Sequence, residues 1–320
     1  MLKIEHVRKM FGRSAALDGL DMEVPKGALY GFVGPNGAGK TTTIRILTGL
    51  LLPDEGRVLV NGSDVVKNPG KVRETIGYVP DSFGVYDNLK VREYMEFFAS
   101  CYGLDGLVAR KRCGMLLGQV GLEEKADFYV DGLSRGMKQR LSLARAMIHD
   151  PEILIMDEPT AGLDPRTRYE FREILQDLKE QGRTVLISSH ILPELAEICT
   201  DIGILDQGRL VLEGSMEDIL AKINVRSPLA ISVSGGRDTA LRILRSHPCV
   251  ETITIRQDDI VVNFSGDRQD EAALLQQLVD AEVMVYGFVR ERSNLESVFM
   301  QITEHEEERM VLVHESESGL

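Results

Sequence analysis

The chain has 320 residues and an acidic balance, with 37 Lys and Arg against 50 Asp and Glu and a formal net charge of −13. Its length is typical of roughly two domains, and its charge disfavours a nucleic-acid groove binder, because that class needs clustered Lys and Arg. The sequence has neither the run of roughly 20 apolar residues that spans a bilayer nor an N-terminal signal peptide, so we expect a cytoplasmic protein.

The first part of the chain alternates short apolar segments with glycine-rich turns, a pattern that indicates β-strands. We predict strands over Leu2–Val7, Ala16–Val24, Leu29–Val33, Gly56–Val60 and Ile76–Val79, and a helix over Thr42–Leu51. The strand over 29–33 is apolar throughout, which favours a buried position directly ahead of the next motif.

That motif has the form G-x-x-x-x-G-K-T, and its residues are Gly34, Pro35, Asn36, Gly37, Ala38, Gly39, Lys40 and Thr41. Glycines let successive backbone N–H groups turn towards an anion, Lys40 can reach the β- and γ-phosphates of a nucleotide, and the Thr41 hydroxyl can bind Mg²⁺. The helix that contains Thr42 points its N-terminus at the same phosphates. The sequence therefore predicts a nucleotide-binding site here.

Helices replace strands between about residues 85 and 150, and alternation returns afterwards. We predict helices over Val91–Tyr102, Val108–Val120 and Gly136–Ile148, then strands over Ile153–Met156, Thr184–Ser188 and Ile202–Leu205 with helices over Arg166–Gln181 and Pro193–Thr200. The alternation predicts an α/β fold with a mainly parallel sheet and a helical insertion at about 85–150. Together with the phosphate-binding motif, we expect the P-loop NTPase class, with an antiparallel β subdomain beside the sheet.

The strand over 153–156 ends in two carboxylates, Asp157 and Glu158. In P-loop NTPases an aspartate at this place holds the metal, and a neighbouring glutamate can orient or deprotonate the attacking water. The same pattern alone also fits a strand that runs into an acidic helix cap. The phosphate-binding motif upstream favours the catalytic interpretation.

Two further motifs complete an ordered set: Leu133-Ser134-Arg135-Gly136-Met137, ahead of an amphipathic helix, and His190, at the end of a predicted strand. With this order of motifs, residues 1 to about 220 resemble the ATP-binding subunit of ABC transporters, and we place the end of this domain at 222. The resemblance implies ATP and Mg²⁺ as ligands and a head-to-tail dimer around two ATP molecules. It also implies that Ser134 and Gly136 contact the γ-phosphate of ATP held by the second copy, and that His190 senses that phosphate.

The resemblance covers two more positions and fails at three. Phe11 falls where the family stacks an aromatic ring on adenine, although an ordinary apolar residue near a strand end is the alternative. Arg135 and Met137 depart from the usual L-S-G-G-Q segment, and Arg135 either adds charge near phosphate or points to solvent. Asp81 replaces the usual glutamine and would add a negative charge beside Mg²⁺. The residues at 161–164 look like the loop that couples the two sites of the dimer.

A second unit follows a linker at 224–228. Its pattern is β-α-β-β-α-β over residues 229 to 289, the split βαβ order of a ferredoxin-like α+β domain, which we place at 229–303. We expect a last helix over Leu295–Ile302 and a frayed acidic tail over 304–320. This unit resembles the tail domain of ABC-2-type export ATPases, and by fold analogy we expect it to hold or regulate the dimer.

We therefore expect an ATP-hydrolysing subunit of an ABC-2-type exporter, which pairs with itself or a closely related ATPase subunit and drives a separate transmembrane permease at the inner face of the membrane. The permease would dock near 83–115, where Phe83, Val85, Tyr86 and Tyr94 line a groove or simply pack in the core. Two alternatives remain: a soluble ABC ATPase that serves nucleic acid, ribosomes or protein assembly, and a nucleotide sensor that does not hydrolyse ATP. We expect no nucleic-acid partner.

Overall fold

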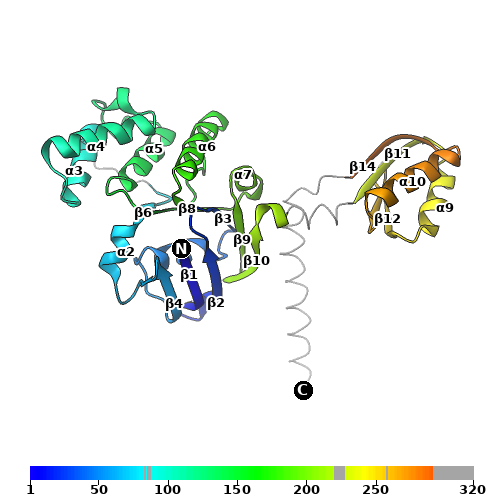
Figure 1. The fold of residues 1–320 in the computed structure, drawn as a ribbon, viewed down its shortest axis with the longest axis horizontal. Helices are drawn as coiled ribbons and strands as arrows, with labels where there is room; N and C mark the ends of the chain where they lie inside the picture. The colour runs from blue at the N-terminus through cyan, green and yellow to red at the C-terminus, as the bar shows by residue number, and fades with distance from the viewer. Residues whose placement is uncertain (83, 85–87, 220–227, 257–258, 291–320) are drawn as a thin grey trace, which may run out of the picture. The chain divides into compact units, whose positions relative to one another are not determined.

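The structure is a computed structural model that describes residues 1–82, 84, 88–219, 228–256 and 259–290 (Figure 1). Its contacts divide the chain into two compact units, Met1–Met216 and Glu217–Leu320. The predicted linker at 224–228, apart from Pro228, lies outside the described residues, as do the predicted helix Leu295–Ile302 and the tail at 304–320.

The first unit contains two sheets. The smaller is antiparallel, with strand order β2-β1-β4-β5, and consists of β1 (Leu2–Phe11), β2 (Ser14–Val24), β4 (Glu55–Val60) and β5 (Ser63–Asp64). The larger has the order β10-β9-β3-β8-β7-β6, and consists of β3 (Leu29–Val33), β6 (Ile76–Val79), β7 (Ile153–Met156), β8 (Thr184–Ser189), β9 (Asp201–Asp206) and β10 (Arg209–Ser215). Every pair of neighbouring strands in this sheet is parallel, except the pair of β9 and β10, which is antiparallel. This confirms the predicted fold class.

Strand order places the sequence motifs together. β3 and β7 are buried at every position, as expected for inner strands of a sheet covered on both faces. Both pair with β8 in parallel, so the segments that follow the three strands leave the same edge of the sheet. Ligands of open α/β sheets bind at this carboxyl edge. The residues after 33, 156 and 189 therefore meet there.

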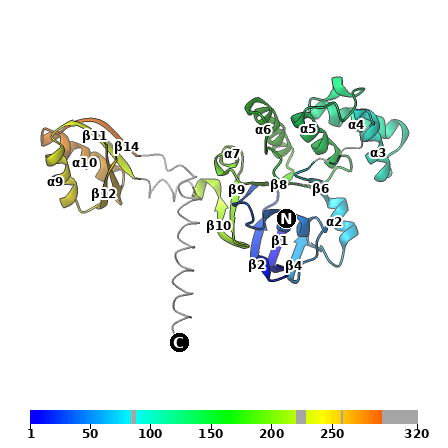
Figure 2. The same ribbon diagram turned by 180° about the vertical axis from the view of Figure 1, so that it is seen from behind.

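Helices pack around the larger sheet and form a separate group beside it. They are α1 (Lys40–Leu47), α2 (Pro69–Thr75), α3 (Val91–Cys101), α4 (Gly106–Gln119), α5 (Arg135–Ala146), α6 (Pro165–Glu180) and α7 (Leu192–Ala196), with a 3₁₀ turn at Glu123–Lys125. Figures 1 and 2 show α3, α4 and α5 together, away from the antiparallel sheet. One core joins both sheets to α1, with Leu20, Phe32, Ile44 and Ile155 fully buried.

Several predicted bounds differ from the structure. The helix after the phosphate motif begins at Lys40 rather than Thr42 and ends at Leu47 rather than Leu51, ahead of Gly49, which has a positive φ of 71°. The helix predicted over Pro193–Thr200 covers only Leu192–Ala196. α2 and β10 were not predicted, because α2 buries a single residue, Val72, and β10 has no fully buried position to give it a pattern.

The second unit consists of β11 (Leu229–Gly235), α9 (Arg237–Ser246), β12 (Val250–Arg256), β13 (Asp259–Phe264), α10 (Arg268–Asp280) and β14 (Met284–Arg290). Its sheet has the order β12-β13-β11-β14, and all neighbours are antiparallel. Leu244 of α9 and Leu274 of α10 share a core with Ile231 of β11 and Val262 of β13. The element order is the β-α-β-β-α-β predicted from the sequence, and it gives a ferredoxin-like fold.

The groove predicted for a permease is only partly described. Phe83, Val85 and Tyr86 lie outside the described residues. Tyr94 is fully buried, receives a hydrogen bond from Arg145 Nη1 at 2.9 Å and packs edge-on against Phe98, so for Tyr94 the core-packing alternative holds. In the parts of the chain that the structure describes, no helix combines the length and apolar character needed to cross a membrane.

Candidate functional site

The phosphate motif forms a loop between β3 and α1. Gly37 and Gly39 have positive φ angles of 89° and 110°, and Gly39 is the N-cap of α1. A Cβ atom on Gly39 would lie 2.5 Å from the carbonyl oxygen of Ala16. Glycine is therefore required at 39 by both its backbone angle and its neighbour. The loop delivers the N-terminus of α1 to the carboxyl edge of the sheet, where backbone N–H groups favour an anion.

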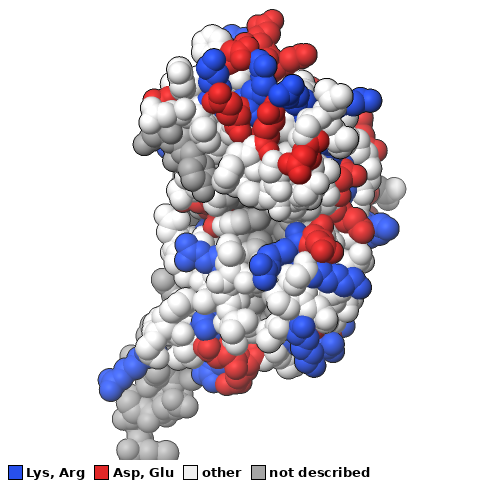
Figure 3. All heavy atoms as spheres, turned by 90° about the vertical axis from the view of Figure 1, so that its left-hand side faces the viewer, with Lys and Arg blue, Asp and Glu red and all other residues white. Residues whose placement is uncertain are grey.

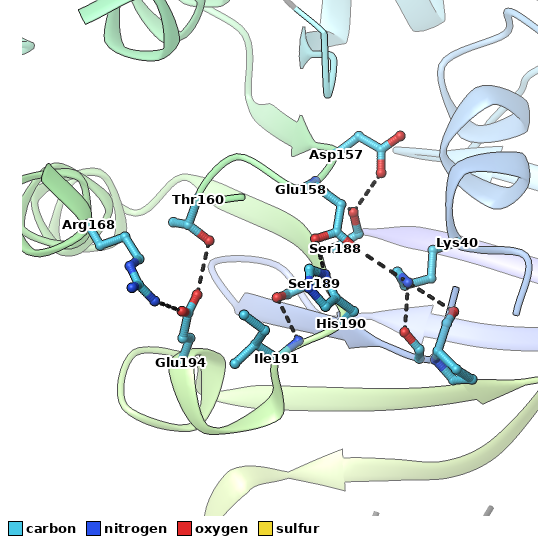
Figure 4. Close-up of polar contacts among 12 residues, drawn as sticks. Lys40, Asp157, Glu158, Thr160, Arg168, Ser188, Ser189, His190, Ile191 and Glu194 are labelled. Carbon is cyan, nitrogen blue, oxygen red and sulfur yellow. Dashed lines mark hydrogen bonds and ion pairs between the residues drawn. The ribbon is translucent and has the colours of Figure 1, made fainter. Parts of the chain in front are cut away.

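Lys40 lies over this loop with its ammonium group held in place. Its side chain is 6% exposed. Nζ donates to the carbonyl oxygens of Gly34 at 2.7 Å and Pro35 at 3.1 Å, and lies 3.4 Å from Oε1 of Glu158. Figure 4 shows these contacts converging on one nitrogen. The positive charge is thus fixed between the loop and the end of β7.

Asp157 is buried directly after β7. Its backbone N–H donates to Val79 at 2.9 Å, and its carboxylate accepts hydrogen bonds from Ser188 Oγ at 2.7 Å and from the Thr41 hydroxyl. Burial raises the pKa of the Asp157 carboxyl, the two hydroxyl donors lower it, and the charges of Asp81 and Glu158 raise it further. The pKa lies above its ordinary value, which means that this pocket favours a cation or a proton on Asp157.

Glu158 stands between two basic groups. Its Oε2 lies 2.8 Å from Nδ1 of His190, while Oε1 faces Lys40 (Figure 4). The residue has a φ of 47°, uncommon for a residue with a side chain. Its backbone N–H donates to Ser188 Oγ at 3.0 Å. Strained positions of this kind are kept where surrounding bonds determine them, and they concentrate at active sites.

A cavity of about 370 Å³ opens over these groups. It is lined by Ala16, Asn36, Gly37, Gly39, Lys40, Thr41, Thr42, Asp81, Glu158, Ala161 and His190. Nine of these were predicted site residues, and the structure brings them together from distant parts of the chain. A second hollow, of about 610 Å³, lies on the antiparallel sheet and contains none of them. The site is therefore the cavity at the carboxyl edge.

Two residues that contribute to the site were not predicted from the sequence. Ser188 both donates to Asp157 and accepts from the N–H of Glu158, and Ala16 lines the cavity from β2. A polar residue directly after the apolar run at 185–187, two positions before His190, was the available sign for Ser188. Nothing local marks Ala16, because its place depends on how the hairpin packs over the loop.

Seven predicted residues do not line this cavity. Four of them lie within two positions of a lining residue in the chain, namely Gly34, Pro35, Ala38 and Asp157, whereas Ser134, Gly136 and Phe11 do not. Ser134 is the N-cap of α5, where its Oγ accepts from the N–H of Met137 at 3.3 Å. Gly136 is buried against α6, and a Cβ there would lie 2.2 Å from Cγ2 of Thr167. Phe11 is 54% exposed at the end of β1. A role for Ser134 and Gly136 in a second copy, and for Phe11 at adenine, stays a prediction.

The residues present fit Mg²⁺ held jointly with phosphate. Among the residues that the structure describes, no group of three or more His, Cys, Asp and Glu could bind a metal unaided. The Thr41 hydroxyl and the Asp157 carboxylate are adjacent beneath the cavity. Mg²⁺ is usually bound by one or two carboxylates together with substrate phosphates, and this donor set matches that description.

Comparison with known proteins agrees with this geometry. The sequence profile of the ABC transporter family matches residues 17–161. The linearmycin resistance ATP-binding protein LnrL of Bacillus subtilis is 33% identical over 305 residues, which covers 95% of this chain and 98% of that protein. The Nod factor export ATP-binding protein I of Ralstonia nicotianae is 34% identical over 308 residues, or 96% of this chain and 94% of that protein.

Solved structures give the same result. A bacterial ABC transporter cassette, solved as a dimer, superposes with a TM-score of 0.61 at 28% sequence identity, covering 68% of this chain and 99% of the cassette. Identity above 30% along nearly the whole length of two relatives, together with this superposition, confirms the resemblance drawn from the motifs. The chain belongs to the ABC transporter family, as an ATP-binding subunit that hydrolyses ATP.

Proposed function

We propose that this chain is the ATP-hydrolysing subunit of an ABC-2-type exporter, which works as a head-to-tail dimer around two Mg·ATP and drives a separate transmembrane subunit. The observation that carries the proposal is the carboxylate of Glu158, held at the cavity between Lys40 and His190. A carboxylate fixed by basic groups on both sides is placed to receive a proton from water.

The loop between β3 and α1 would bind the phosphates. The N-terminus of α1 and the N–H groups after Gly37 attract the β- and γ-phosphates, and the Lys40 ammonium adds a full positive charge there. Thr41 and Asp157 would hold Mg²⁺, which neutralises phosphate charge when bound. Asp81 lines the same cavity, so it adds a negative charge beside the metal where the family has a neutral amide.

Hydrolysis then needs a general base whose carboxylate is held in a fixed orientation. Glu158 takes a proton from the water that attacks the γ-phosphorus as the bond to the ADP oxygen breaks, giving ADP and phosphate. His190 holds Oε2 of Glu158 at 2.8 Å. Ser188 holds the Glu158 backbone at 3.0 Å. These contacts leave the carboxylate little freedom to turn away from the cavity.

The residues at the start of α5 support the proposed dimer. Ser134 uses an oxygen lone pair to cap Met137, which leaves its O–H free to donate to an anion. α5 has 12 residues, and its N-terminus favours negative charge. Ser134 and Gly136 do not line this chain's own cavity, so their proposed ligand is the γ-phosphate of ATP bound to a second copy.

A membrane partner is proposed from the relatives and from one surface. Two relatives are named as resistance and export ATP-binding proteins. The helices α3 and α4 leave large apolar side chains 47% to 82% exposed, among them Phe97, Leu107, Val108 and Met115. Charged side chains of both signs are interspersed on the side that bears α3 and α4 (Figure 3). Apolar anchors among mixed charges suit docking of a permease's cytoplasmic segment, at the inner face of the membrane.

The test is reconstitution. The chain is purified with its candidate permease, placed in lipid vesicles, and compared for Mg·ATP hydrolysis with the chain alone. Glu158→Gln removes the base, and Glu180→Gln, an exposed change at the end of α6, is the matched control. We expect the permease to co-purify and to change a hydrolysis rate that Glu158→Gln abolishes and Glu180→Gln leaves intact.

Two results would overturn the proposal in different ways. Hydrolysis that depends on Glu158 but proceeds without any associated membrane protein favours a soluble ABC ATPase. Binding of ATP with a negligible rate in the unaltered chain, with or without the permease, favours a nucleotide sensor.

A further inference from the structure

Arg135 is the first residue of α5 and stands where the family segment has glycine. Its guanidinium lies against the loop that follows the catalytic strand. A Cβ built on Gly162 would lie 2.6 Å from Arg135 Nη1, 2.8 Å from Cζ and 3.2 Å from Nη2. The guanidinium therefore occupies the space beside Gly162 that any other residue's side chain would fill.

Gly162 is the middle of a short connection, here called the 158–164 loop, between Glu158 and α6 (Pro165–Glu180). Its φ is 67°, a left-handed angle that glycine adopts without strain. Ala161, its neighbour, lines the cavity together with Glu158 and donates its N–H to the Glu158 carbonyl at 3.1 Å. A shift of Gly162 would therefore move Ala161, and through its hydrogen bond it would move Glu158, the catalytic residue.

Hydrogen bonds also hold the 158–164 loop on both sides of Gly162, at Thr160 and at Asp164. Thr160 donates to Glu194, which also pairs with Arg168 (Figure 4). Asp164 caps α6 by accepting from the N–H of Thr167 at 3.1 Å. Between these two anchors, Gly162 is where Arg135 makes its contact, and this contact comes from a different helix.

We propose that Arg135 is a positioning residue, which holds the 158–164 loop and thereby couples the start of α5 to the catalytic cavity of the same chain. Arginine suits this task because its guanidinium is flat, rigid and permanently charged, whereas a lysine ammonium is a point charge on a flexible stem. Where α5 also meets ATP of a second copy, a step that rests on the proposed function, Arg135 would transmit that contact to Glu158.

A second contact supports the coupling. Gly136 is buried, and a Cβ there would lie 2.2 Å from Thr167 Cγ2 at the start of α6. The first two residues of α5 thus touch the 158–164 loop and the helix that follows it. The start of α5 and the end of this loop form one packed surface, and Arg135 brings a charged side chain to it beside Gly162.

The experiment is a double-mutant cycle on the full chain, using steady-state hydrolysis of Mg·ATP. The variants are Arg135→Ala, Gly162→Ala and the double variant, with Arg135→Lys as the conservative change and Arg73→Ala, an exposed arginine of α2, as the control. We expect Arg135→Ala to lower kcat about tenfold with KM nearly unchanged. Arg135→Lys should behave like Arg135→Ala, because charge alone does not replace the flat contact.

Gly162→Ala is expected to lower kcat by a similar factor, because its methyl group meets the guanidinium. In the double variant that clash is gone, so the loss should be close to that of the worse single variant and not the product of the two, on the order of 100-fold. Thermal unfolding of each variant shows whether it folds. If Gly162→Ala does not fold, the comparison of Arg135→Ala with Arg135→Lys decides the question.

Three results would overturn the proposal. If the loss of kcat in the double variant equals the product of the two single losses, the two residues act independently. Full rescue by Arg135→Lys, or a rise in KM alone, would make Arg135 a charge that binds phosphate. An unchanged rate in Arg135→Ala would leave it without a role. The cycle needs no membrane partner, and hydrolysis is first shown to depend on Glu158, so failure of the proposed function is recognised separately.

Discussion

At the scale of single residues, the site depends on one hydroxyl group that serves two carboxylate residues. Ser188 Oγ donates to the buried Asp157 carboxylate and accepts from the N–H of Glu158. Because Glu158 has a left-handed backbone angle, this bond offsets part of the strain. Asp157 and Glu158 are therefore both held by a residue that is not among those lining the cavity.

Asp157 gives a prediction on pH. Its pKa is raised in the folded protein mainly by burial, so the ionised form destabilises the fold at pH values above the raised pKa, and the penalty disappears as pH falls below the ordinary carboxyl range. Asp157→Asn should raise the Tm of the nucleotide-free protein at pH 7, with a gain that shrinks on acidification. Calorimetry at a series of pH values measures this, and a lower Tm at pH 7 than in the unaltered chain would contradict it.

Asp81 gives a prediction on the metal. It lines the cavity and its charge raises the pKa of Asp157. We expect Asp81→Asn to keep ATP binding but to change the Mg²⁺ concentration needed for half-maximal hydrolysis, because one negative charge beside the metal is lost. Titration of the rate with Mg²⁺ is the measurement, and Asp105→Asn, at the N-cap of α4, is the control. An unchanged titration would remove Asp81 from the metal site.

At the scale of elements, apolar runs decided what could be predicted. The bounds of β3, β6 and β7 were predicted to the residue, because strands covered on both faces are apolar throughout. β10, whose positions are all either partly buried or exposed, carried no such pattern. The contact of Arg135 with Gly162 could not be predicted, because it joins α5 to a loop 27 positions away whose path depends on the whole sheet.

The loop before α1 gives a prediction at this scale. Gly39→Ala forces an unfavourable φ and places a methyl group 2.5 Å from the carbonyl of Ala16. We expect a loss of stability on the order of 2–3 kcal/mol, together with loss of ATP binding. Gly70→Ala, at a helical position with open space around it, is the control: it should keep ATP binding and should not lower stability, because alanine favours a helix more than glycine does. Chemical unfolding and nucleotide titration of both variants measure this, and equal behaviour would contradict it.

At the scale of the whole molecule, topology builds the site from residues far apart in the chain. Lys40, Glu158 and His190 meet because β3, β8 and β7 are parallel neighbours. The sequence indicated a mainly parallel sheet and an antiparallel sheet in the first unit, and the ferredoxin-like order of the second unit. Each of these follows from the order of strands and helices along the chain. The proposed contact of Ser134 and Gly136 with ATP involves a second copy of the chain, and it stays a prediction. The role of the second unit in the dimer stays a prediction.

The most direct measurement is Mg·ATP turnover of Glu158→Gln beside the unaltered chain and Glu180→Gln, with the molar mass of each followed by light scattering in the presence of ATP. We expect turnover of Glu158→Gln to fall by at least about 100-fold, because the general base is lost, while the variant accumulates as an ATP-bound dimer. Glu180→Gln should match the unaltered chain. Turnover in Glu158→Gln close to that of the unaltered chain, with no ATP-dependent dimer, would contradict a catalytic role for the cluster of Lys40, Glu158 and His190.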